Sequence, residues 1–226
     1  CCFCPCAYTG AVAAFGMWGE NSRQRMGEMI SLDGNSLTID EVIRVARKYE
    51  KVAIGEAGCR QVAVSRAVVE KLLESEQPIY GISTGFGNLS TIWISPAERE
   101  KLQRNLILSH AAGVGECLPE DVVRAAMLMR ANSLAKGYSG IRPETLEMLI
   151  ALLNHRVYTA VPSKGSVGAS GDLSPLSHVA LVLMGEGKAF VDGEIVPGRA
   201  ALANARVRDR RTRRIRPPCP DESGYP

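Results

Sequence analysis

Apolar positions recur with a helical period along most of the chain, and the first clear case begins near residue 38. Thr38 and Glu41 have the spacing of a capping box, in which each side chain accepts a hydrogen bond from the backbone N–H of the other residue. The apolar residues that follow are spaced for one face of a helix: Ile39, Val42, Ile43 and Ala46. A second helix is predicted from about Val62 to Glu74.

Serine and proline mark the starts of the later helices. Ser95, Pro96 and Glu98 repeat the capping pattern and predict a helix that ends near His110. Three further helices are predicted, each beginning at a proline: Pro119 to about Ala135, one from Pro143 with Leu146, Leu149, Ile150 and Leu153 on one face, and Pro175 to about Met184.

A short β-hairpin is predicted near the end of the helical region. Residues Phe190 to Val196 flank an Asp192-Gly193 pair, and such a pair favours the tight turn of a hairpin. The sequence therefore predicts one all-α domain that carries a small β-hairpin.

Composition excludes several classes of partner. The chain has 226 residues, of which 46% are hydrophobic, and this is enough for one good core. Its formal net charge of +3 gives no reason to expect a nucleic-acid partner. The apolar stretch from Ala7 to Trp18 is interrupted by glycines, is too short to span a bilayer and follows no basic segment. We therefore expect no membrane partner and no signal peptide.

The chain begins with a cluster of cysteines: Cys1, Cys2, Cys4 and Cys6. No spaced second pair and no histidine accompanies the cluster, so we expect no metal site. Residues 1–29 are interpreted as a non-native or disordered leader, with a true start near Met26 or Met29. Cys59 and Cys117 also lack partner spacing, which favours a reducing cytoplasm as the location of the protein.

The other end, residues 204–226, has a different composition from the rest. Seven arginines lie between residues 206 and 216, and three prolines follow them. One interpretation is a disordered arginine-rich tail that contacts nucleic acid, although no aromatic residue is interleaved to stack on bases. The interpretation that we favour is a frameshift or a fused foreign end beyond Asn204.

The segment with the strongest chemical signal is Gly165 to Gly171, in which Val167 is the one larger residue. Ser174 is predicted to cap the helix that follows, with Pro175 in its first turn. The positive end of that helix dipole would then face the small-residue loop. A group in the loop would experience a field that stabilises developing negative charge.

Composition leaves three interpretations of this loop open. The first is a flexible linker or surface turn. The second is a nest of backbone N–H groups for phosphate, although the spacing of the glycines at 165, 168 and 171 fits neither the Walker pattern nor GxGxxG. The third is chemical: in a sharply bent Ala169-Ser170-Gly171, the nitrogen of Gly171 attacks the carbonyl of Ala169. Loss of water then leaves a five-membered ring with an electrophilic methylene.

Three segments together resemble one family, the aromatic amino acid ammonia-lyases. Lys164 to His178 reads KGSVGASGDLSPLSH, Tyr80 to Gly87 reads YGISTGFG, and Arg104 to Gly113 reads RNLILSHAAG. They occur in the order and spacing of that family, and the resemblance extends over residues 30–203. It implies the helical, fumarase/aspartase-like fold of the family's amino-terminal part, in a protein that forms long-helix homotetramers.

The resemblance assigns roles within the loop. It implies that Ala169, Ser170 and Gly171 form 4-methylidene-imidazol-5-one (MIO) autocatalytically, with no diffusible cofactor. Asp172 would support the loop. The ring captures electron density from the substrate, which makes the departure of ammonia feasible although the β-hydrogen is unactivated.

Two further residues of the YGISTGFG segment receive roles from the resemblance. Tyr80 matches the general base that removes the β-proton, and Gly87 is expected at the substrate. A phenol can act as that base only where nearby positive dipoles or cations favour its ionised form. Without the resemblance, the same segment reads equally as a simple turn with a buried Tyr80.

His110 is the residue expected to select the substrate. It falls where histidine-specific family members carry a histidine that faces the substrate ring. Burial of an imidazole substrate without a partner for its ring nitrogens costs on the order of 1–3 kcal/mol for each. The resemblance therefore implies a histidine ammonia-lyase, which converts L-histidine to trans-urocanate and ammonia. His155 and His178 are interpreted as structural.

Two alternatives remain. A tyrosine or phenylalanine ammonia-lyase or aminomutase would differ mainly in the pocket around His110. The chain as it stands would also be incomplete, because family members are more than twice as long and combine residues from several subunits in each active site. In that case it is an inactive amino-terminal fragment that only associates with intact partners.

Overall fold

Seven helices contain most of the residues that the computed structural model describes, which are 29–74, 78–168 and 170–205. The helices are α2 (Ile39–Lys48), α3 (Glu56–Glu74), α4 (Pro96–His110), α5 (Glu120–Ala135), α6 (Pro143–Asn154), α7 (Leu173–Leu183) and α8 (Gly198–Asn204). A 3₁₀ turn, η1 (Gly87–Leu89), precedes α4. The mostly helical class predicted from the sequence is confirmed. The leader and the arginine-rich tail lie outside the described residues, apart from positions 29, 204 and 205.

Short strands form three small sheets between the helices. The strands are β1 (Ile30–Leu32), β2 (Val52–Ile54), β3 (Val114–Cys117), β4 (Tyr158–Thr159), β5 (Pro162–Lys164), β6 (Lys188–Val191) and β7 (Glu194–Pro197). β1 and β2 pair in parallel, β3 and β5 pair antiparallel, and β6 lies between β4 and β7. The β6–β7 hairpin turns at Asp192 and Gly193, as predicted; the other strands were not predicted.

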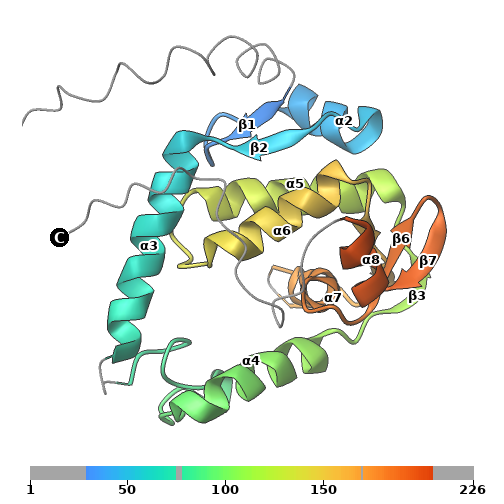
Figure 1. Ribbon diagram of the computed structural model, residues 1–226. Coiled ribbons are helices and arrows are strands. Elements are labelled where there is room, and N and C mark those ends of the chain that lie inside the picture. The colour runs from blue at the N-terminus through green and yellow to red at the C-terminus, as the bar shows by residue number, and fades with distance from the viewer. Residues whose placement is uncertain (1–28, 75–77, 169, 206–226) are drawn as a thin grey trace, which may run out of the picture.

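α5 and α6 lie at the centre of the fold and supply much of its core (Figure 1). α2 and α3 pack on this pair, and α7 joins it to α4 and α8. The core residues of the central pair are fully or almost fully buried: Val123, Met127, Leu128, Ala131, Leu134, Ala135, Leu146, Met148, Leu149, Ile150, Leu152 and Leu153. The apolar face predicted for α6 therefore faces the core, and burial of such side chains stabilises the fold by roughly 1.5–3 kcal/mol each.

The helix starts follow the local capping chemistry. Thr38 Oγ1 accepts a hydrogen bond from the backbone N–H of Glu41 at 3.3 Å, and Glu41 Oε2 accepts one from that of Thr38 at 2.8 Å. The predicted capping box is thus present. Pro96 and Pro143 occupy the first turns of α4 and α6, where a missing N–H leaves no hydrogen bond unmade.

α3 begins six residues before the predicted position of Val62. Gly58 is buried in its first turn, and a Cβ at that position would lie 2.9 Å from the carbonyl oxygen of Leu32. The glycine therefore allows close packing of α3 against β1, and the helix continues through it. This start depends on a contact with residues distant in the sequence, which local pattern does not reveal.

Candidate active site

The small-residue loop, residues 165–172, lies between a β-ribbon and a helix. β5 leads into it and pairs with β3, so that Val114 lies opposite Lys164. α7 begins immediately after the loop, at Leu173. The positive end of the α7 dipole therefore faces the loop, as the sequence predicted.

Two glycines bring the segment after α4 into contact with the start of this loop. A Cβ on Gly165 would lie 2.9 Å from the Cα of Gly113 and 2.8 Å from Ser174 Oγ. A Cβ on Gly113 would lie 2.9 Å from His178 Nε2. Side chains at either glycine would force these segments apart. The end of the His110 segment and the beginning of the loop are thus packed backbone to backbone.

A hydrogen bond from Gly113 to His178 holds this crossing together. The backbone N–H of Gly113 donates to His178 Nε2 at 3.1 Å. Burial of the imidazole lowers the pKa of His178, which favours the neutral form in which Nε2 is an acceptor. The expectation that His178 is structural is compatible with this contact, but sequence reasoning did not foresee that the contact reaches the loop.

The reactive part of the loop is exposed and contains glycines with positive φ. Ser170 is exposed, and Gly168 and Gly171 have φ of +83° and +70°. A Cβ on Gly171 would lie 2.5 Å from Ser166 Oγ, whereas one on Gly168 would meet nothing within 4 Å. The positive φ favours glycine at position 171, and a side chain there would also have to displace the Ser166 hydroxyl. Ala169 lies outside the described residues.

The prediction that Ser174 caps α7 is wrong. The N-cap is Asp172, whose carbonyl oxygen accepts a hydrogen bond from the N–H of Leu176 at 2.9 Å, and its side chain makes no capping bond. Ser174 lies inside the first turn, with its hydroxyl buried towards Gly165 and without a hydrogen-bond partner among the described residues. The loop is thus two residues shorter than the sequence suggested.

His110 ends α4 with a defined ring orientation. Its Nδ1 lies 2.8 Å from the carbonyl oxygen of Leu106 and 3.1 Å from Ser109 Oγ. A carbonyl oxygen can only accept, so we assign the proton of the neutral ring to Nδ1. Nε2 then carries a free lone pair and has no hydrogen-bond partner among the described residues.

Tyr80 lies in a turn wound around the backbone of Ile79. The carbonyl oxygen of Ile79 accepts hydrogen bonds from the N–H groups of Ile82, Ser83 and Thr84 at 2.9–3.2 Å. The N–H of Ile79 donates to Ser83 Oγ at 2.8 Å. The tyrosine itself is 63% exposed, and its ring packs edge-on against Phe86 with centroids 5.8 Å apart. The alternative of a buried Tyr80 is therefore excluded.

The structure brings together some of the predicted site residues and not others. The turn that contains Tyr80 and Gly87 lies at the amino-terminal end of α4, whereas α7 packs near the opposite end of that helix (Figure 1). Among the described residues, no hydrogen bond or ring contact joins Tyr80 to His110 or Ser170. Gly87 is exposed, with a φ of +57° and open space around its Cα.

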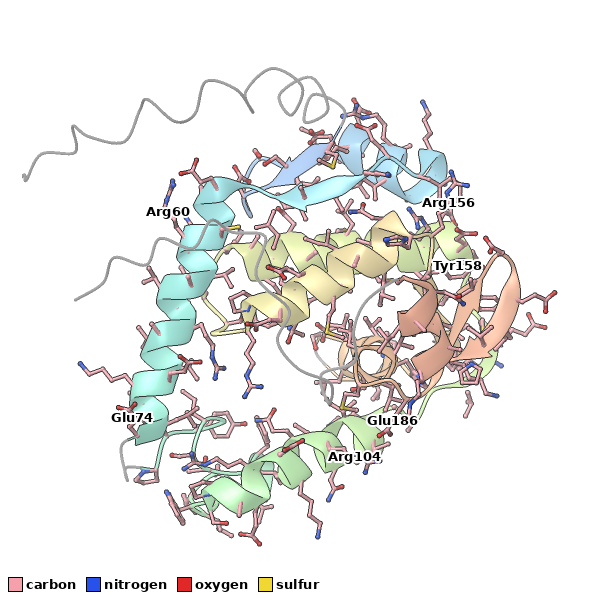
Figure 2. The ribbon with its side chains drawn as sticks, in the orientation of Figure 1. Arg60, Glu74, Arg104, Arg156, Tyr158 and Glu186 are labelled. Atoms are coloured by element: carbon pink, nitrogen blue, oxygen red, sulfur yellow. The ribbon has the colours of Figure 1, made fainter. Side chains whose placement is uncertain are left out.

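An ion pair that sequence reasoning missed fixes α4 against the turn after α7. Arg104 Nε and Nη2 donate to Glu186 Oε1 at 3.0 and 2.8 Å (Figure 2). The backbone of Glu186 is in close contact with Gly198 at the start of α8. Arg104 therefore ties the helix that carries His110 to the same part of the fold that carries the loop.

The described parts of the chain offer neither a membrane-spanning helix nor a metal-binding cluster. No helix there is both long and apolar enough to cross a membrane. No group of three or more histidine, cysteine, aspartate or glutamate residues in those parts could hold a metal ion. The cysteine cluster at residues 1–6 lies outside them.

Known sequences similar to this chain come from one family. The model of the family described as "Aromatic amino acid lyase" matches residues 37–212. Histidine ammonia-lyase of Alkaliphilus metalliredigens is 52% identical over 178 residues, and that of Bacillus subtilis is 50% identical over 179 residues. Each alignment covers 79% of this chain and 35% of the relative. The chain thus spans about a third of the length of the curated relatives it matches.

Solved structures lead to the same family. Histidine ammonia-lyase from Trypanosoma cruzi has a TM-score of 0.72 and 36% identity, over 80% of this chain and 35% of that one. Tyrosine aminomutase from Streptomyces globisporus has a TM-score of 0.73 and 39% identity, over 80% and 34%. The family model matches most of the length of this chain, and the relatives and structures above agree with it. The chain therefore belongs to the aromatic amino acid lyase family.

Proposed function

We propose that this chain is part of a histidine ammonia-lyase, which converts L-histidine to trans-urocanate and ammonia. The observation that carries the proposal is the arrangement of His110, whose Nε2 has a free lone pair at the end of α4, three residues before the glycine that packs against the small-residue loop. A neutral imidazole substrate has one ring N–H, and this group can donate to Nε2. The identities near 50% to histidine ammonia-lyases also support this substrate.

The loop residues fit the MIO group that such an enzyme requires. Cyclisation joins the nitrogen of Gly171 to the carbonyl carbon of Ala169. The carbonyl oxygen leaves as water with the amide hydrogens of Ser170 and Gly171, and the Ser170 hydroxyl leaves as a second water with its Cα hydrogen. The positive φ of Gly171, its contact with Ser166 and the exposure of Ser170 are compatible with this chemistry. The group, once formed, supplies an electrophilic methylidene that promotes the departure of the amine.

The surrounding residues would bind the substrate and move its proton. The dipole of α7 stabilises negative charge that develops at the loop. Tyr80 is proposed to remove the β-proton. Its phenol is largely exposed and therefore open to a substrate.

A homotetramer in the cytoplasm is part of the proposal. α4 has no buried residue although it carries several apolar side chains, among them Leu102, Leu106 and Ile107. The apolar side chains of α4, which are only partly buried here, are expected to pack against further protein, either the remaining two-thirds of a full-length relative or a second subunit.

A tyrosine-specific lyase or aminomutase is the second candidate. A tyrosine aminomutase shares 39% identity with this chain, and a phenol hydroxyl could donate to His110 Nε2 as well as an imidazole N–H can. Phenylalanine has no such donor, so the free lone pair of His110 disfavours it.

The deciding experiment uses the product of the complete reading frame that contains these residues. Purified protein is incubated separately with L-histidine, L-tyrosine and L-phenylalanine, and urocanate, coumarate and cinnamate are followed by their ultraviolet absorbance. The β-amino acids are followed by chromatography. Histidine is expected to give urocanate with the highest kcat/KM, whereas turnover of tyrosine without turnover of histidine would replace the proposal by its alternative.

A further inference from the structure

We propose that His178 is a positioning residue for cyclisation of the small-residue loop, through its hydrogen bond to Gly113. This inference rests on the proposed function, because it concerns the formation of the MIO group from Ala169, Ser170 and Gly171. His178 does not touch the reacting atoms. It acts by holding the segment after α4 against the first residue of the loop.

The contacts form a continuous chain from α7 to the loop. Two buried valines fix α7 in the core. Val179 follows His178 directly, and Val182 lies one turn further along. His178 Nε2 accepts the hydrogen bond from Gly113 at 3.1 Å, and Gly113 is packed directly against Gly165. The loop therefore begins at a point that is fixed to the helix with which it ends.

This closure matters because cyclisation requires a bent backbone. The ring forms only when the loop is held in a strained arrangement, and surrounding structure must supply that restraint. The β3–β5 ladder reaches Lys164 and α7 begins at Leu173, so the restraint acts on the residues between them. Two side chains of α7 join the two ends of this segment: Ser174 lies directly against Gly165, and His178 holds Gly113 by the one hydrogen bond that this pair of side chains makes across the segment among the described residues.

The role requires an acceptor at the position of Nε2. The N–H of Gly113 is partly buried, and an unpaired donor there would seek water and draw the segment away from the loop. A glutamine at position 178 places an amide oxygen near the position of Nε2, whereas a leucine fills similar space without an acceptor. His178→Gln is therefore expected to retain the function and His178→Leu to lose it.

The experiment measures cyclisation itself. The complete protein is synthesised in a cell-free system, and samples taken over time are digested and analysed by mass spectrometry for loss of two water molecules from the peptide that spans residues 165–178. Loss of one neutral hydrogen bond is expected to slow dehydration of His178→Leu by about five- to tenfold. His178→Gln is expected to dehydrate within about twofold of the wild-type rate. His155→Leu, at an exposed histidine that ends α6, is the matched control and should not change the rate.

A second variant approaches the same contact from the other side. Gly113→Ala places a methyl group 2.9 Å from His178 Nε2 and 3.2 Å from Pro162 Cβ, and should slow dehydration also. Because both changes weaken the contact between Gly113 and His178, the double variant is expected to be slowed by less than the two single effects combined. Turnover per cyclised subunit should remain at the wild-type value in every variant, which a general loss of folding would not produce.

The outcomes separate this inference from the proposed function. Absence of dehydration in the wild-type protein would overturn both. Dehydration and histidine turnover in the wild type, with an unchanged rate in His178→Leu, would overturn this inference alone. Equal slowing in His178→Gln and His178→Leu would also overturn it, because the acceptor would then be irrelevant. If His178→Leu does not fold, His178→Gln and Gly113→Ala decide: the first should keep the rate and the second should lower it.

Discussion

The guanidinium of Arg124 lies over the ring of Tyr49, with 4.6 Å between its central carbon and the ring centroid. Arg124 is fully buried, and it donates hydrogen bonds to the carbonyl oxygens of Val45, Ala46 and Leu153 at 2.8–3.3 Å. These carbonyls belong to the last turns of α2 and α6; that of Leu153 also accepts a hydrogen bond from the N–H of Arg156, just beyond α6, at 3.2 Å. The buried guanidinium of Arg124 therefore caps the carboxyl-terminal ends of two helices, where the helix dipoles are negative.

Replacement of Arg124 by lysine is expected to destabilise the fold. A lysine cannot reach both Val45 and Ala46 as the guanidinium does and leaves at least one of these carbonyls unpaired, so the free energy of unfolding should fall by about 1–3 kcal/mol. Denaturant unfolding measures the change. Arg130→Lys, at an exposed position on the same helix, is the control and should lie within about 0.5 kcal/mol of the wild type. Equal stabilities of the two variants would refute the role of Arg124.

Stability should depend on pH through Glu147. Burial, with a smaller contribution from the charge of Glu144, raises the pKa of Glu147 from 4.5 to about 7. Between these two values the folded chain holds a proton that the unfolded chain has lost, so folding stability decreases as the pH rises. Below pH 4.5 both states are protonated and the effect disappears.

Replacement of Glu147 by glutamine should remove this dependence. Above pH 7 the variant is expected to be more stable than the wild type by up to about 3 kcal/mol, and near pH 4 the two should converge. Thermal or denaturant unfolding across this range measures the difference. The exposed Glu194→Gln serves as the comparison, and a pH-independent difference for Glu147→Gln would contradict the assignment.

Substitution of the loop glycines should separate backbone strain from close contact. Gly168 and Gly171 both have positive φ, but only at Gly171 would a methyl group collide with Ser166 Oγ. We expect Gly171→Ala to abolish dehydration of the loop and Gly168→Ala to slow it, as read from the mass of the loop peptide. Equal rates for the two variants would show that the contact with Ser166 has no role.

His110 should determine the use of histidine. His110→Leu removes the Nε2 acceptor, and kcat/KM for histidine is expected to fall roughly 10- to 100-fold without a change in loop dehydration. Ser109→Ala removes a hydroxyl that lies beside the ring and should have a smaller effect, because Leu106 still orients Nδ1. A His110→Leu enzyme that converts histidine normally would exclude this residue from substrate recognition.

The sequence predicted correctly those features of the fold that neighbouring residues determine. The capping box at Thr38, the starts of α4 and α6 and the Asp192-Gly193 turn all agree with the structure. The strands outside the β6–β7 hairpin escaped prediction, because partners distant in the sequence hold them in place. Ser174 was misplaced because two neighbouring polar residues, Asp172 and Ser174, can both precede a helix, and only packing selects between them.

The candidate site was predictable in its residues but not in its connections. Motif order identified Tyr80, His110 and the loop, because each belongs to a segment that resembles the family. The contact between Gly113 and Gly165 and its hydrogen bond to His178 were not predictable, since they join three segments by packing alone. The one indication of these contacts in the sequence is the glycine at each of the two positions, 113 and 165, where the backbones approach closely.

The central claim is that Ala169, Ser170 and Gly171 become the electrophile of an ammonia-lyase. The most direct measurement is the mass of the peptide spanning residues 165–178, taken from the product of the complete reading frame while it is converting histidine. The account predicts a mass lower than that of the unmodified sequence by two water molecules. An active enzyme whose loop peptide has its full, unmodified mass would contradict it.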